Sequence, residues 1–83
     1  MLTEKQIFKI IAKAVETENE NITIDSTWDT VDNWDSLTQL TILALLDRAT
    51  EGKSNHVPEL ASSFTIRDIL ENLKKADLLD VVN

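Results

Sequence analysis

The sequence contains no cysteine, and it has only one glycine, one proline and four aromatic residues, two Trp and two Phe. Without cysteine the chain has no disulfide, no thiolate nucleophile and no cysteine-ligated zinc or iron–sulfur site. The longest apolar run, Ile42–Leu46, is far shorter than the roughly 20 residues of a membrane-spanning helix. The first residues lack the pattern of a secretory signal peptide. We therefore expect a protein of a reducing compartment, the cytoplasm, without membrane insertion.

Basic residues are also scarce, since 8 Lys and Arg stand against 15 Asp and Glu, for a formal net charge of −7. Nucleic acids and anionic membranes are bound through clusters of Lys and Arg, so neither is expected as a partner. The segment 16–36 holds acidic residues and no basic one: Glu16, Glu18, Glu20, Asp25, Asp29, Asp32 and Asp35. This segment is expected to attract a basic partner, and a loop that is merely solvated is the alternative.

Apolar residues recur at helical spacing in three stretches, which predicts an all-α protein. The 83 residues suffice for one domain, and we expect a small four-helix bundle over 1–83. The expected elements are a helix over 4–17, an acidic loop over 18–34, a helix over 36–51, a short helix over 58–62, a helix over 65–75 and a tail over 76–83. The expected core is Ile7, Ile11, Leu40, Leu43, Leu46, Ile66, Ile69 and Leu70. The loop is expected to be held on the core by Ile22, Ile24, Trp28 and Val31.

Local signals mark where these helices begin and end. Thr3 with Gln6 three residues later forms a capping box, and Asp35 and Thr65 are expected to cap the second and last helices. Gly52, the only glycine, is a natural stop for the second helix.

Residues suited to catalysis or metal binding are few. His56 is the only histidine, and its polar surroundings predict a surface loop. Asp32 and Asp35 lie in a solvated loop, where the pKa of a carboxyl group is hard to raise by burial. Together with Asp29 they lack the spacing and the glycine of a calcium-binding EF-hand loop. No residue set offers a nucleophile, a base and an oxyanion stabiliser together, so we expect neither an enzyme nor a metal site.

Ser36 is the one hydroxyl that suggests chemistry. It follows the Asp35 cap at the first turn of the second predicted helix, where a side chain faces solvent. A phosphate ester on it would lie beside free backbone N–H groups and the positive end of the helix dipole. The residues alone leave two interpretations open, a modification site and an ordinary serine near a helix start.

The stretch Asp35-Ser36-Leu37, preceded by Trp34, resembles the acyl carrier protein family. The layout of the chain over 4–75 is also similar, with a leading helix, a long acidic loop and a closing segment Phe64–Leu70. The resemblance implies a right-handed four-helix bundle with a short helix III. It also implies that Ser36 carries 4′-phosphopantetheine, which a phosphopantetheinyl transferase transfers from coenzyme A. Asp35 would belong to the surface that this transferase recognises. The thiol of this arm holds an acyl or aminoacyl group as a thioester, and the carrier itself performs no catalysis.

The sequence departs from the carriers of fatty acid synthesis around this motif. Those carriers usually have small residues before the D-S-L motif and several acids on the surface of the helix after it, whereas this chain has Asn33-Trp34 before the motif and the neutral residues Thr38, Gln39 and Thr41 on the matching surface. We therefore expect a specialised carrier for a dedicated pathway of the polyketide, peptide, lipid or surface-sugar type.

Partners of such a carrier would be the transferase and acyl-loading or acyl-transfer enzymes with basic docking surfaces, bound by a monomeric carrier. The residues expected to contact them are Asp32, Trp34, Asp35 and Leu37. Within the second helix, Leu37, Ile42 and Leu45 are expected in the core, and a cleft for an acyl chain between helices II and III is the alternative that the family suggests. A different function is also open, namely a helical interaction domain of the same fold that lacks the arm and binds a basic partner through 16–36.

Overall fold

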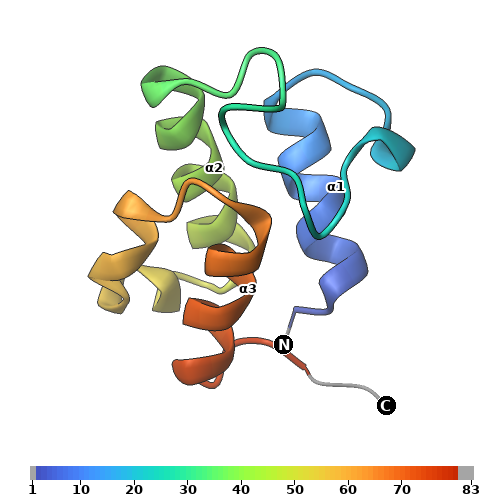
Figure 1. The fold of residues 1–83 in the computed structure, drawn as a ribbon. Helices are drawn as coiled ribbons and strands as arrows, with labels where there is room; N and C mark the ends of the chain where they lie inside the picture. Colours follow the sequence, from blue (N-terminus) through green and yellow to red (C-terminus); the bar gives the residue numbers. More distant parts are fainter. Residues whose placement is uncertain (1, 81–83) are drawn as a thin grey trace.

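Three α-helices account for most of the regular structure in the computed structural model, which describes residues 2–80 (Figure 1). They are α1 (Glu4–Ala14), α2 (Ser36–Ala49) and α3 (Ile66–Lys75), joined by the short 3₁₀ helices η1 (Asn19–Asn21), η2 (Lys53–His56) and η3 (Pro58–Ser62). Over residues 2–80 the fold is all-helical and contains no strand, as the periodicity predicts. No helix in this range is long and apolar enough to cross a membrane.

The predicted starts of the helices are confirmed by their caps. The Thr3 hydroxyl accepts from the Gln6 backbone N–H while the Gln6 side chain accepts from the Thr3 N–H, which completes the capping box. Asp35 and Thr65 each accept a hydrogen bond from a backbone N–H in the first turn of their helices. These caps are local interactions, which is why sequence alone predicts them.

The predicted ends are less accurate. α1 stops at Ala14 rather than at position 17, because the chain turns at Glu16 with a positive φ of 60°. α2 stops at Ala49, two residues before the predicted end, and Gly52 then adopts a φ of 85° that favours glycine. The short helix over 58–62 is present as η3, but it is a 3₁₀ helix, and sequence analysis missed η2 before it.

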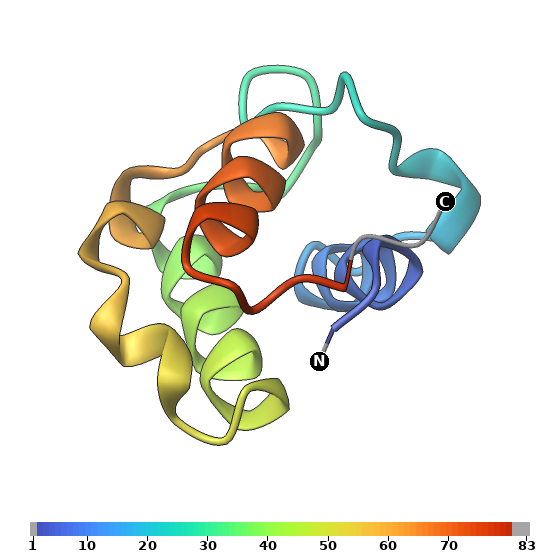
Figure 2. The ribbon, with the colours of Figure 1, turned by 90° about the horizontal axis from the view of Figure 1, so that it is seen from below.

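The tail after α3 does not continue the helix. Asp77 has a positive φ of 64°, and the chain then returns to the start of α1 (Figure 2). There the backbone N–H of Leu2 donates to Leu78 and that of Asp80 donates to Leu2, while Leu79 is buried. Positions 81–83 of the predicted tail lie outside the described residues.

The core lies between the three helices, and most of the predicted core residues are in it. Ile7, Ile11, Leu46, Ile66, Ile69 and Leu70 are buried as predicted. The prediction is wrong for Leu40, which is 63% exposed, and only partly right for Leu43, which packs against the edge of the core. The reason is that apolar residues cover most of the circumference of α2, so periodicity does not reveal which side its neighbours cover.

The loop between α1 and α2 is fixed to the beginning of α3. Ile66 donates its backbone N–H to Ser26, Trp28 donates to Phe64, and the rings of Trp28 and Phe64 stack with centroids 4.1 Å apart. Of the four residues expected to hold this loop, Ile22 is buried and Val31 packs on the core. Ile24 and Trp28 are instead exposed over more than a third of their surface, because their contacts are to the edge of the bundle.

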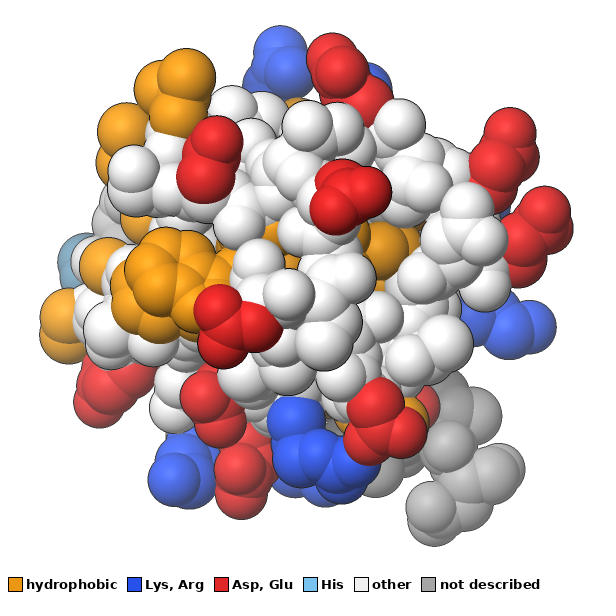
Figure 3. All heavy atoms as spheres, turned by 45° about the horizontal axis from the view of Figure 1, so that its top comes forward, with side chains coloured by type: hydrophobic (Ala, Val, Ile, Leu, Met, Phe, Trp, Pro, Cys, Tyr) orange, Lys and Arg blue, Asp and Glu red, His pale blue; other side chains and the backbone are white. Residues whose placement is uncertain are grey.

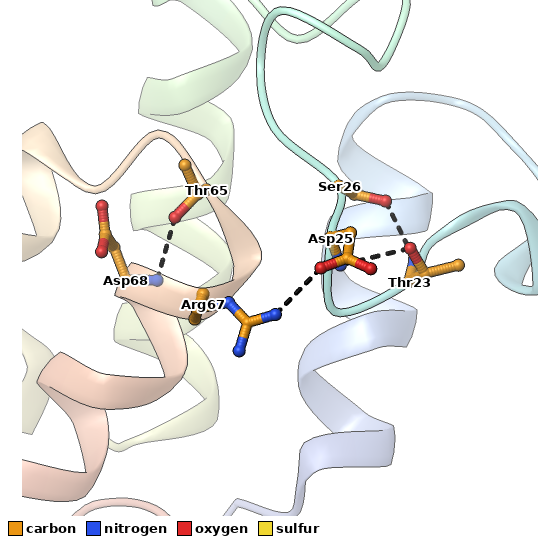
Figure 4. A network of polar contacts seen from close by, with 6 residues as sticks. All are labelled: Thr23, Asp25, Ser26, Thr65, Arg67 and Asp68. Carbon is orange, nitrogen blue, oxygen red and sulfur yellow. Dashed lines mark hydrogen bonds and ion pairs between the residues drawn. The ribbon is translucent and has the colours of Figure 1, made fainter.

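An ion pair and a set of turns complete this attachment (Figure 4). Arg67 in α3 donates to the Asp25 carboxylate at 2.9 Å, and the Ser26 hydroxyl accepts from the Thr23 backbone N–H. Both charged side chains are largely exposed, so the pair adds little stability. The loop is therefore ordered mainly by its backbone hydrogen bonds and by the apolar contacts.

Candidate functional site

Ser36 lies at the first position of α2, with its side chain exposed. Asp35 caps the helix, since its Oδ1 accepts from the Thr38 backbone N–H at 2.9 Å. This hydrogen bond lowers the pKa of the Asp35 carboxyl from its ordinary value, because it favours the ionised form. No hydrogen bond within residues 2–80 engages the Ser36 hydroxyl, which leaves it accessible beside an ionised carboxylate.

A buried polar network fixes the backbone on both sides of Ser36. The Trp34 Nε1–H donates to Gln39 Oε1 at 2.8 Å. The Gln39 Nε2 group donates in turn to the backbone carbonyls of Leu60 and Ser63, at 3.0 Å each. Both side chains are only 3% exposed, and this burial is tolerated because the indole and the amide use their polar atoms. The network joins the end of the loop, the first turn of α2 and η3.

Two expectations are corrected by this network. Trp34 was expected to contact partners, but its side chain lies in the core and donates its N–H inward. Gln39 was expected on the outer surface of α2, and it is buried. Part of the Trp34–Gln39 interaction could be expected from the sequence, because a buried tryptophan usually needs an acceptor for its N–H. Sequence does not show that the acceptor is Gln39, because that depends on how the loop enters α2.

The surface of α2 beside Ser36 is apolar and uncharged. Leu37 is 73% exposed and Leu40 is 63% exposed, and Thr41 and Ala44 are exposed with them. The expectation that Leu37 lies in the core is therefore wrong, whereas its expected exposure to partners is compatible with this position. Of the other two helix residues expected in the core, Ile42 is buried and Leu45 is half-buried.

The loop between α1 and α2 exposes acidic side chains. All seven acids of the segment 16–36 are exposed, Asp32 and Asp35 among them, and in the described part of the chain only Asp25 is in an ion pair. Figure 3, which brings the loop end of the molecule forward, shows acidic side chains spaced around apolar ones. Such a surface suits a partner that presents both apolar and basic groups.

A shallow hollow of about 410 Å³ lies next to Ser36, between the end of α1 and the start of α2. Its lining mixes polar and apolar side chains: Lys13, Glu16, Asn33, Leu37, Thr41 and Leu45 are among them. The hollow is open to solvent and is not an enclosed cavity, so a chain that lies in it stays in contact with water.

The other candidate residues lie apart from Ser36 or are unsuited to catalysis. His56 is exposed in η2, as predicted, and Asp29 is exposed in the loop. Within the described part of the chain, no three acidic or histidine side chains lie close enough together to hold a metal ion. The lowered pKa of Asp35 keeps it ionised near neutral pH, which is the opposite of what a general acid needs.

No protein-family model, no curated protein and no solved structure matches this chain. What can be concluded about function therefore depends on the surroundings of Ser36 and on the resemblance of the segment around it.

Proposed function

We propose that the chain is an acyl carrier protein that holds acyl or aminoacyl groups as thioesters on 4′-phosphopantetheine attached to Ser36. The observation that supports this most strongly is the exposed Ser36 hydroxyl, free of hydrogen bonds within residues 2–80, at the first position of α2 in the D-S-L motif. A transferase must bring coenzyme A to this oxygen, and an exposed residue on a capped helix end allows that approach.

The residues around Ser36 suit a phosphodiester. The first N–H groups of a helix have no partner within the helix, and Asp35 accepts that of Thr38, so a phosphate on Ser36 would lie near the positive end of the helix dipole. In the transfer, the serine oxygen forms a bond to the β-phosphorus of coenzyme A. The pyrophosphate bond breaks, adenosine 3′,5′-bisphosphate leaves, and the transferase accepts the serine proton. The arm then supplies the thiol that the chain itself lacks.

The finer architecture belongs to the same proposal. We assign α1, α2, η3 and α3 to the four helices of a carrier bundle, with η3 as the short helix III. Its bounds, Pro58–Ser62, coincide with those expected from the sequence, and its Leu60 is buried against the core.

The surface beside Ser36 favours a dedicated pathway over general fatty acid synthesis. A partner that docks on the first turns of α2 meets Leu37 and Leu40, with Asp32 and Asp35 exposed in the preceding residues. Its complementary surface would be apolar opposite α2 and basic opposite the loop. Partners selected for a helix rich in acids would find little charge along α2, so housekeeping elongation enzymes are expected to use this carrier poorly.

Incubation with coenzyme A, magnesium and a broad-specificity transferase tests the proposal. Intact mass spectrometry is expected to show the addition of one phosphopantetheinyl group to the wild type and none to Ser36→Ala. Ser62→Ala is the matched control, because Ser62 is also an exposed serine, in η3. Unmodified wild type, or equal modification of Ser36→Ala, would refute the assignment.

A second function is favoured by one observation, the exposure of all seven acids in 16–36. A carrier-like interaction domain without the arm would bind a basic partner through this loop. The intact mass of the protein purified from its native host separates the two functions, because only the carrier has the added phosphopantetheine.

A further inference from the structure

We infer that the group carried on Ser36 is short or polar and stays outside the helical bundle, rather than a long alkyl chain enclosed by it. This inference rests on the proposed carrier function and narrows its cargo. A chain tethered at the start of α2 can enter the bundle only where the neighbouring helices leave apolar space. The inference therefore depends on the two seams beside Ser36, where α2 lies against η3 and against the end of α1.

The seam between α2 and η3 is filled and polar. Gln39 lies three residues after Ser36, and its amide occupies this seam with two hydrogen bonds to the carbonyls of Leu60 and Ser63. Leu60 and Ser63 are buried on the η3 side. No buried side-chain nitrogen or oxygen in residues 2–80 lacks a hydrogen-bond partner. Disruption of the network would therefore leave buried polar atoms without partners.

An alkyl chain that enters this seam would have to displace the Gln39 amide. It would break the hydrogen bonds from Gln39 to the two carbonyls, and an alkyl chain has no group that could donate hydrogen bonds in their place. A buried polar group without a partner is strongly unfavourable, so the apolar contacts of the chain would be offset by the loss of the network.

The seam between α1 and α2 is the open hollow, and it carries charge. Lys13, Glu16 and Asp35 are among the residues at its surface. Covering these charges with an alkyl chain removes water from them without a replacement. A short acyl group or a polar one, such as an aminoacyl group, can lie there and keep the charges hydrated.

The experiment compares cargo lengths on the same attachment point. Because the chain has no cysteine, Ser36→Cys provides a single thiol that reacts with maleimides. Two flexible linkers of pantetheine length are attached, one ending in an acetyl amide and the other in an octanoyl amide. This attachment needs no transferase, so the failure of the proposed function and the failure of this inference are distinguishable.

Thermal unfolding is the first measurement. Each methylene buried in the bundle would multiply the ratio of folded to unfolded protein by about fourfold, so an enclosed octanoyl group would raise the Tm well above that of the acetyl form. We expect the two Tm values to agree within about 2 °C. If the Tm of the octanoyl form is more than about 4 °C above that of the acetyl form, the octanoyl group is buried and the inference is overturned. For a difference between these two limits, the second measurement decides whether the octanoyl group is buried.

The second measurement follows the network itself. In ¹⁵N-labelled protein, the Trp34 indole N–H and the Gln39 side-chain amide are expected to keep the same NMR positions in both forms. Movement of these signals in the octanoyl form alone would show entry at the α2–η3 seam and would also overturn the inference.

Discussion

Replacement of Gln39 by methionine removes the polar atoms of the network while it keeps the length of the side chain. Two buried groups lose their partner, the Trp34 indole N–H and the Ser63 carbonyl, while the Leu60 carbonyl keeps the hydrogen bond from the Ser63 backbone N–H. Each unsatisfied group costs about 1–3 kcal/mol, and partial relaxation of η3 reduces the sum. We expect a loss of about 2–5 kcal/mol in the free energy of unfolding.

This loss is large for so small a domain. A chain of 83 residues has a total stability of about 4–12 kcal/mol, so Gln39→Met removes a large share of it. Urea unfolding followed by circular dichroism measures the change, with added stabilising osmolyte if the variant is partly unfolded.

A double-mutant cycle tests whether the loss comes from the network. Trp34→Phe removes one donor from Gln39 Oε1, so its cost and that of Gln39→Met overlap. The double variant is expected to lose less stability than the sum of the two single variants. A cost of Gln39→Met below about 1 kcal/mol, or strict additivity in the cycle, would refute the reasoning.

Three further predictions concern α2, its cap and the loop. Ile42→Ala is expected to lower the free energy of unfolding by about 2–5 kcal/mol because Ile42 is fully buried, whereas Leu40→Ala is expected to leave it nearly unchanged; equal losses in urea unfolding would contradict the assigned faces. Asp35 has a lowered pKa in the folded state, so its contribution to stability is present above the ordinary carboxyl pKa and is lost as pH falls through the lowered one. Asp35→Asn should therefore flatten the acid side of a plot of Tm against pH, and an unchanged slope would count against the cap. Arg67→Ala removes the exposed ion pair with Asp25 and is expected to cost less than about 1 kcal/mol; a larger loss that disappears in salt would show that the pair matters.

Features that depend on neighbours in the chain could be predicted well. The capping box of Thr3 and Gln6 and the caps of Asp35 and Thr65 involve residues three apart, and all are present. The amphipathic patterns of α1 and α3 also identified buried residues such as Ile7 and Ile69, because one side of each helix is clearly polar. The position of Ser36 at a helix start follows from the same local signals.

The sequence by itself determined that the protein is helical, where its helices begin and that an exposed serine begins the second of them. Only the tertiary structure decided which side of α2 is buried, placing Gln39 inside and Leu37 and Leu40 outside. The physical reason is that a glutamine can be buried only where donors and acceptors meet it, and those of Gln39 include carbonyls 21 and 24 residues away in the chain. No local pattern contains that information, because it arises when η3 and the end of the loop pack against the same turn of α2.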